Sequence, residues 1–155
     1  MNFSKIYSYT NSGNKNWEYQ VNGVTDVVID KEYNKYFIEN DHNVAVLDQN
    51  KNKKWTFATG GPCFNTIADN KTIYVGSFDG YIYAVNTDGS LKWYLNTGSA
   101  IIQPPVINKD GTLYVVNKKG YLYAIKTNAS GLADSPWPMY GHDVRNTNNY
   151  NTKIK

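Results

Sequence analysis

The sequence predicts an all-β fold in which one unit is repeated along the chain. Three observations lead to this prediction: a tryptophan that returns at a fixed interval, a strand-like composition inside each interval, and glycine-containing turn signals that divide it. The tryptophans are Trp17, Trp55 and Trp93, spaced 38 residues apart, and they begin the similar phrases WEYQVNG, WTFATGG and WYLNTGS. A fixed period of this length indicates a tandem array.

The composition within one period indicates strands. Between residues 72 and 95 the chain reads TIYVG, YIYAVN and LKWYL, which are β-branched and aromatic runs separated by Asp-Gly turn signals. No window carries apolar residues at the three-and-four spacing of a helix. In this middle repeat we therefore expect four strands, at about 63–68, 72–76, 81–86 and 91–96.

Four antiparallel strands per repeat predict a β-propeller, in which four-stranded blades pack face to face around a channel. A blade between two neighbours buries both faces, which fits the apolar and aromatic residues on both sides of YIYAV. We expect about three to three and a half blades and 13 strands in one domain, 1–155. The expected units are a blade remnant at 5–20, blade 1 at 24–58, blade 2 at 62–96, blade 3 at 101–141 with the segment around Trp137 as a rough fourth strand, and a tail at 142–155.

The repeat resembles the PQQ-like, or quinoprotein-type, repeat of pyrroloquinoline quinone dehydrogenases and of many propellers without a cofactor. IIQPPVINKDGTLYVVNKKGYLYAIKTN (101–128) is similar to its first three strands, and GSLKWYLNTG (89–98) to its turn and tryptophan-bearing fourth strand. SPWPMYGHDVRNTN (135–148) is similar to a terminal segment of bacterial members. The resemblance implies that each of the three tryptophans docks between adjacent blades. The first repeat departs from the pattern, because it has Asp41-His42 where the second has Asp79-Gly80.

Glycines and inter-blade links complete the set of candidate residues. We expect Gly60 and Gly98 to form tight turns, and Gly80 and Gly120 to lie in the turns between strands. Propellers recognise ligands mainly through loops at one rim of the channel, since the rigid sheets hold those loops in place. The links between blades, at 22–25, 60–62 and 99–103, therefore provide the candidate surface for a protein or peptide ligand: Thr25, Gly61, Pro62, Ser99 and Gln103.

The catalytic inventory is short. His42 and His142 lack the spacing of a metal site, and we expect Cys63 to be a buried structural thiol. We expect no cofactor and no bound metal. The net charge of +3 is weak, and the lysine run at 51–54 is interpreted as a solvated loop rather than a nucleic-acid surface. No apolar stretch is long enough to span a bilayer.

Two functional classes follow from the sequence. The first is a non-catalytic scaffold or binding propeller for protein–protein interaction. Known propellers have at least about four blades, so we expect two chains to complete one ring as a homodimer, with strand 16–19 of one chain completing the last blade of the other and strand 5–10 left over. A competing interpretation is the C-terminal part of a longer cell-surface propeller.

The second class is a fragment of a PQQ-dependent dehydrogenase. Such enzymes are several times longer and typically carry adjacent cysteines against the quinone and calcium ligands beside it, whereas this sequence has one cysteine. We therefore expect no enzyme. The start MNFSKIYSYTNS lacks the apolar segment of a signal peptide. This indicates a cytoplasmic protein if the chain is complete, and an exported or cell-surface one if a leader is missing.

Overall fold

The computed structural model describes residues 3–67 and 71–140, and within them it contains strands, turns and loops but no helix. The strands are β1 (Phe3–Tyr9), β2 (Lys15–Asn22), β3 (Val24–Ile29), β4 (Lys35–Glu39), β5 (Asn43–Leu47), β6 (Lys53–Ala58), β7 (Cys63–Ile67), β8 (Thr72–Ser77), β9 (Tyr81–Asn86), β10 (Leu91–Asn96), β11 (Val106–Ile107), β12 (Thr112–Val116) and β13 (Leu122–Lys126). The predicted all-β class is confirmed, and the described residues contain the expected 13 strands.

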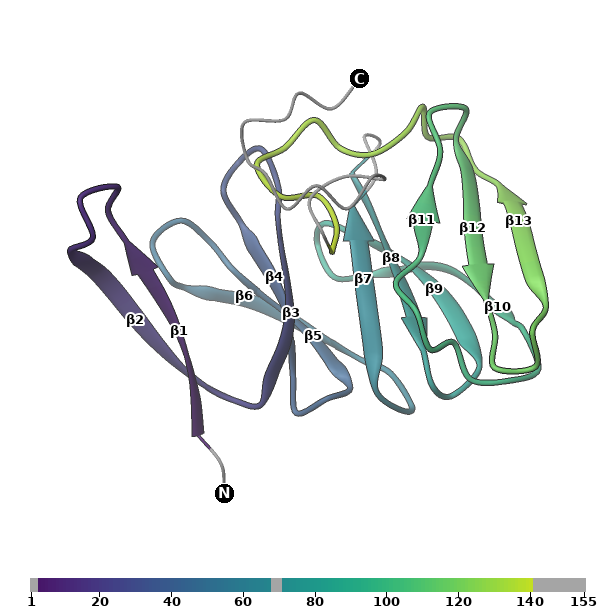
Figure 1. Ribbon diagram of the computed structural model, residues 1–155, viewed down its shortest axis with the longest axis horizontal. Coiled ribbons are helices and arrows are strands. Elements are labelled where there is room, and N and C mark those ends of the chain that lie inside the picture. The colour runs from purple at the N-terminus through teal and green to yellow at the C-terminus, as the bar shows by residue number, and fades with distance from the viewer. Residues whose placement is uncertain (1–2, 68–70, 141–155) are drawn as a thin grey trace.

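The strands form four antiparallel sheets that follow one another in chain order across the molecule (Figure 1). The first is the hairpin β1–β2. Blade 1 has the order β3-β4-β5-β6 and blade 2 the order β7-β8-β9-β10, while blade 3 has the three strands β11-β12-β13. Every connection inside a blade is a hairpin, because consecutive strands are separated by short turns rich in Asp, Asn and Gly.

Each blade has two apolar faces, and neighbouring blades share a core. In blade 1 the register pairs Ile38 with Val44, and both side chains are buried against blade 2. Ala45 and Leu47 point to the opposite side and pack with Ile6 and other residues of the hairpin. We call the side toward the following sheet the forward face and the side toward the preceding sheet the backward face. This alternation follows from the two-residue period of a strand.

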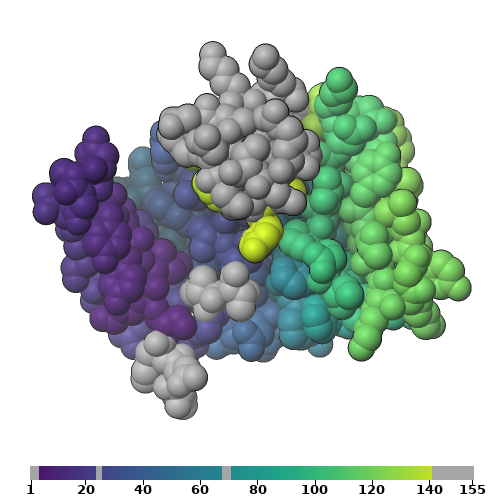
Figure 2. All heavy atoms as spheres, viewed as in Figure 1, coloured from purple at the N-terminus to yellow at the C-terminus, as the bar shows by residue number. Residues whose placement is uncertain are grey.

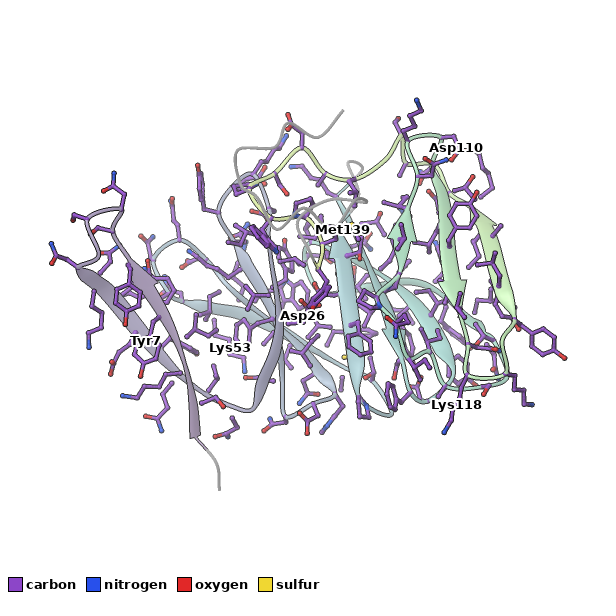
Figure 3. All side chains as sticks on the ribbon, viewed as in Figure 1. Tyr7, Asp26, Lys53, Asp110, Lys118 and Met139 are labelled. Atoms are coloured by element: carbon purple, nitrogen blue, oxygen red, sulfur yellow. The ribbon has the colours of Figure 1, made fainter. Side chains whose placement is uncertain are left out.

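The two ends of the blades differ. The link end carries the connections between sheets and the β12–β13 turn with Lys118, whereas the tail end carries the β11–β12 turn with Asp110 (Figure 3). The first connection is shorter than expected. β2 ends at Asn22 and β3 begins at Val24, so only Gly23, with φ 58°, lies between them, and Thr25 belongs to β3 rather than to a rim loop.

The segment after β13 differs from the expected fourth strand of blade 3. Residues 129–140 cross the tail end and return to blades 1 and 2, where Trp137 bridges Ile29 of β3 and Met139 bridges Thr66 of β7 (Figure 1). Pro136 explains part of this behaviour, as does the proline at 138, because neither residue has an N–H to donate to a ladder beside β13. We call residues 129–140 the return segment.

Candidate functional site

The link end is held together by Asp79, which lies in the β8–β9 turn. Its Oδ2 accepts hydrogen bonds from the Gly60 amide and the Tyr83 hydroxyl, at 2.7 Å each, and its Oδ1 accepts one from the Tyr81 amide at 3.0 Å. Burial and the nearby Asp79 carboxylate raise the pKa of Tyr83. A Cβ atom at Gly60 would lie 2.9 Å from Asp79 Oδ2, so this position requires glycine. Asp79 therefore ties the exit of blade 1 to blade 2.

Two threonines repeat a second contact at the same end. The Thr59 hydroxyl lies within hydrogen-bond distance of the carbonyls of His42 (2.8 Å) and Gly61 (2.7 Å). The Thr97 hydroxyl lies 2.9 Å from the carbonyls of Gly80 and Ser99. Both side chains are buried. Both threonines lie outside the predicted candidate set, although the repeated Thr-Gly pair at 59–60 and 97–98 marks them in the sequence.

The predicted rim residues divide into two groups. Pro62 and Gln103 are exposed at the link end, while Gly61 and Ser99 are half-buried. The carbonyl of Gly61 accepts hydrogen bonds from hydroxyls in blades 1 and 2, so this glycine serves the junction between them. The predicted turn glycines Gly80, Gly98 and Gly120 have φ values of 91°, 73° and 81°.

Aromatic side chains gather beside this rim. Phe64 and Phe78 lie with their ring centroids 6.3 Å apart, and Phe78 is 43% exposed. Further out, Tyr81 and Tyr83 both contact Tyr94, with centroids 5.7 and 6.5 Å apart. Exposed aromatic groups on a rigid scaffold are typical of protein interaction surfaces.

Trp55 lies between blades 1 and 2. Its Nε1 donates a 2.8 Å hydrogen bond to the carbonyl of Thr87 in the next blade, and its ring packs edge-on against Tyr36 at 5.9 Å. A Cβ atom at Gly89 would lie 2.8 Å from the indole, so the β9–β10 turn closes directly over the ring. Trp55 thus links β6, the fourth strand of blade 1, to the β9–β10 hairpin of blade 2.

The other two repeat tryptophans occupy related places. Trp93 packs against the core between blades 2 and 3, with its ring 5.8 Å from that of Tyr74. Trp17 lies in the hairpin, and the Lys35 ammonium of blade 1 is 5.6 Å from its ring centroid. At this distance the contact is a cation–π interaction.

A polar pocket of about 520 Å³ lies at the tail end between blades 1 and 2. Its lining residues are Asp30, Glu32, Asn34, Lys54, Trp55, Lys71, Thr87 and Asp88. Lys71 and Glu32 form an ion pair across it at 3.3 Å. Asp30 is buried and accepts hydrogen bonds from the Tyr36 hydroxyl at 2.9 Å and from Asn34, which fixes the β3–β4 turn. The pocket therefore carries charges of both signs.

Two buried polar side chains face each other on the first strands of blades 1 and 2. Asp26 of β3 accepts a long hydrogen bond, 3.4 Å, from the backbone amide of Asn65 in β7. Burial raises the pKa of Asp26 to about 6. Asn65 is completely buried, and within residues 3–67 and 71–140 neither its Oδ1 nor its Nδ2 has a hydrogen-bond partner. Such unpaired groups are costly in a protein interior.

Cys63 and His42, the candidate reactive residues that the structure describes, both have roles in packing or turns. Cys63 is buried, and burial raises the pKa of its thiol to about 11. His42 is exposed in the β4–β5 turn, where its carbonyl accepts hydrogen bonds from Thr59. His142 lies outside the described residues. Residues 3–67 and 71–140 hold no group of three or more His, Cys, Asp or Glu side chains suited to a metal, and no helix there could cross a membrane.

The outer sheets leave apolar surface uncovered. The register aligns Val44 of blade 1, Ile82 of blade 2 and Leu122 of blade 3 at the same position of the forward face. Val44 and Ile82 are 0% exposed, whereas Leu122 is 64% exposed and its cross-strand neighbour Val116 41%. The hairpin forms the opposite end of the molecule (Figure 2), and there the side chain of Tyr7 is 49% exposed. Exposed apolar side chains therefore lie at both ends of the row of sheets.

Comparison with solved structures decides the architecture. BamB from Moraxella catarrhalis matches with a TM-score of 0.67 at 15% identity, over 79% of this chain and 38% of that one. The chain has a β-propeller fold. A streptogramin B lyase matches with a TM-score of 0.60 at 14% identity, over 80% of this chain and 48% of the other. A protein of unknown function from Bacteroides caccae matches with a TM-score of 0.54 at 17% identity, over 81% and 53%.

At these identities the likeness concerns the fold. The chain spans between 38% and 53% of the length of the three structures. No protein-family model matches the sequence, and no curated protein matches it.

Proposed function

We propose that this chain is a non-catalytic interaction module of the PQQ-like repeat type, and that two copies complete one propeller. One observation carries the proposal: a position that is fully buried in blades 1 and 2 is 64% exposed in blade 3, at Leu122. In blades 1 and 2 the backward face of the next sheet covers it. The forward face of blade 3 therefore carries an apolar side chain at a junction position, but no following sheet packs on it within the described chain.

The hairpin supplies a backward face, on which two tyrosines lie beside the Lys5–Glu18 ion pair. Tyr7 and Tyr9 occupy the hairpin positions that correspond to Ala45 and Leu47 of blade 1, one repeat earlier, and their rings lie 6.2 Å apart. In a ring every forward face meets a backward face. Blade 3 of one copy would therefore meet the hairpin of the other, and a two-fold axis along the channel would close both junctions.

The hairpin is one unit. β1 pairs with β2 from Phe3 opposite Asn22 to Tyr9 opposite Lys15, so the strand that the sequence analysis left over already has a partner. Glu18 strengthens the pair through ion pairs with Lys5 at 2.9 Å and Lys15 at 3.0 Å. In the proposed ring the intact hairpin of one copy packs, as a unit, on the forward face of blade 3 of the other.

Solution mass tests this proposal. Light scattering at micromolar concentration should give about twice the 17.6 kDa of one chain. Leu122→Lys places a charge on the open face and should yield a folded monomer, while Tyr33→Lys, at a turn residue that is 55% exposed and remote from that face, should remain dimeric. A well-folded monomer of the unaltered chain would contradict the proposal that two copies form one ring.

The non-catalytic part of the proposal is supported by the surroundings of Cys63 and His42. The thiol is held in its neutral form by burial, and the histidine serves its turn through its backbone. Neither residue lies in the polar pocket at the tail end. Incubation with pyrroloquinoline quinone and calcium should leave the absorbance spectrum of the mixture equal to the sum of its parts, and a stoichiometric complex would contradict the proposal.

A further inference from the structure

The return segment binds the first strands of two blades in the manner of an added β-strand. The Ile29 amide donates to the Trp137 carbonyl at 2.6 Å, and the Trp137 amide donates back at 3.3 Å. The Ile67 amide donates to the Pro138 carbonyl at 2.8 Å, and Ala133 donates to the Ile67 carbonyl at 3.0 Å. These are main-chain bonds, which any extended peptide can supply.

The bound residues lie deep in the molecule. Met139 is 3% exposed and Ala133 is 9% exposed, and Figure 3 places Met139 near the middle of the view with Asp26. The first half of the segment therefore buries Ala129 and Ala133, and its last part buries Pro138 and Met139. Prolines at 136 and 138 keep the segment extended, and because they have no N–H, no donor is lost at those positions.

The fit between the return segment and the blades is incomplete. Among the residues that the structure describes, the buried Ser135 Oγ has no hydrogen-bond partner. The same holds for both side-chain polar atoms of Asn65, the neighbour of the bridging residue Thr66. A second cavity of about 160 Å³ lies under Ala133 and Asp134. Unpaired buried groups weaken binding, and a peptide that satisfied them would bind better than the segment itself.

We propose that the ends of β3 and β7 form a docking site for an extended peptide of a partner protein, and that the return segment occupies this site as a displaceable place-holder. The peptide recognised carries the same pattern, which is a small residue followed by Pro-aromatic-Pro-Met. The inference deepens the proposed interaction role by naming a partner class, and it does not depend on the pairing of two copies.

Hydrogen exchange on the unaltered full chain gives the first test. If the segment is displaceable, the amides of Ile29 and Ile67 exchange through a local opening, much faster than the amide of Tyr74 in central strand β8. Equal protection of all three amides would overturn the proposal, because the segment would then leave only when the whole protein unfolds.

Peptide binding gives the second test, with a fluorescein-labelled peptide of residues 131–140 as the probe. In the full chain, Trp137→Ala combined with Met139→Ala should bind this peptide at least tenfold more tightly than the unaltered chain does, and the bound peptide should restore protection at Ile29 and Ile67. Tyr140→Ala, at a residue that is 60% exposed, is the matched control and should behave like the unaltered chain.

Equal affinity in both chains, or equal binding of a scrambled peptide, would contradict the docking site. Should the double variant fail to fold, the exchange experiment on the unaltered chain still decides the question. If the chain is a monomer that binds the peptide, the two-copy ring is wrong and the docking site is supported. If it is a dimer that does not bind the peptide, the docking site is wrong and the ring is supported.

Discussion

At the scale of single residues, polar side chains at the junctions between blades mostly find partners. Asp79 joins blade 1 to blade 2 through Gly60, and the Thr97 carbonyl accepts hydrogen bonds from Asn117 at 2.8 Å and from the Tyr123 hydroxyl at 2.7 Å. Asn65 and Asp26 are exceptions, and among the described residues the buried carboxylate of Asp26 receives hydrogen bonds from backbone amides alone. Buried charge without an ion-pair partner reduces stability.

Replacing Asp26 by Asn should therefore stabilise the protein at neutral pH. Its folded pKa of about 6 lies above the ordinary value of 3.8, so the protonated form favours folding. That contribution is present below pH 3.8 and is lost as the pH rises through 6. We expect a gain of about 1–3 kcal/mol in the free energy of unfolding at pH 7.5 and almost none at pH 4. Urea denaturation at both values measures it.

Asp48→Asn is the matched control for this pH dependence. Hydrogen bonds from Asn52 in its turn hold the pKa of Asp48 below the ordinary value, so its carboxylate favours folding above pH 3.8. Its removal should lower stability at pH 7.5, opposite in sign to Asp26→Asn. A loss of stability at pH 7.5 in the Asp26 variant would show that the carboxylate is stabilised by contacts not described above.

Truncation of Trp55 should be among the most damaging changes in the chain. Trp55→Ala removes the hydrogen bond to Thr87 and the packing against Tyr36 and Gly89, so we expect a loss of about 3–5 kcal/mol. Trp17→Ala should cost less in a monomer, since the hairpin packs on one side only. Thermal unfolding of both variants measures the difference. Equal melting temperatures would show that the contacts of Trp55 with blade 2 add no particular stability.

At the scale of elements, each blade is a meander of antiparallel strands, and the turns of its hairpins are rich in Asp, Asn and Gly. The threonine contact adds a second closure at the link end, where Thr97 ties the end of β10 to the turn before β9. Thr97→Val keeps the shape and removes the hydroxyl. We expect a loss of about 1–2 kcal/mol in urea denaturation. Thr56→Val on the exposed side of β6 should change little, and an equally small effect at both positions would count against the repeated contact.

Much of this organisation could be predicted from local pattern. Strands β9 and β10 have the predicted bounds, because their alternation and their Asp-Gly turns are local signals. The return of residues 133–139 to β3 and β7 could not be predicted, since it depends on free strand edges far away in the sequence. From the sequence Asp79 was interpretable only as a turn residue, because the Gly60 amide that it binds comes from the preceding blade.

At the scale of the whole molecule, the sheets form a row with unlike ends. A row of this kind closes only with further blades, and the exposed Leu122 and Tyr7 show which faces they would meet. If two copies close the ring, folding and association are linked.

Melting temperature should accordingly depend on concentration. A tenfold increase in protein concentration should raise the melting temperature of the unaltered chain by a few degrees, because the dimer dissociates as it unfolds. Leu122→Lys should abolish that dependence, and Tyr33→Lys should keep it. Melting that is independent of concentration, together with a monomeric mass, would rule out a ring built from two copies.

The return segment also has a consequence for how the chain folds. Tandem repeats usually fold by local steps, each unit docking on the one before it. Here Ile29 pairs with Trp137 and Thr66 pairs with Met139 through isolated β-bridges. Blades 1 and 2 therefore gain their last backbone partners from the final part of the described chain. Contacts between such distant positions slow folding and prolong the exposure of strand edges. During synthesis, blades 1 and 2 thus leave the ribosome before the segment that completes them.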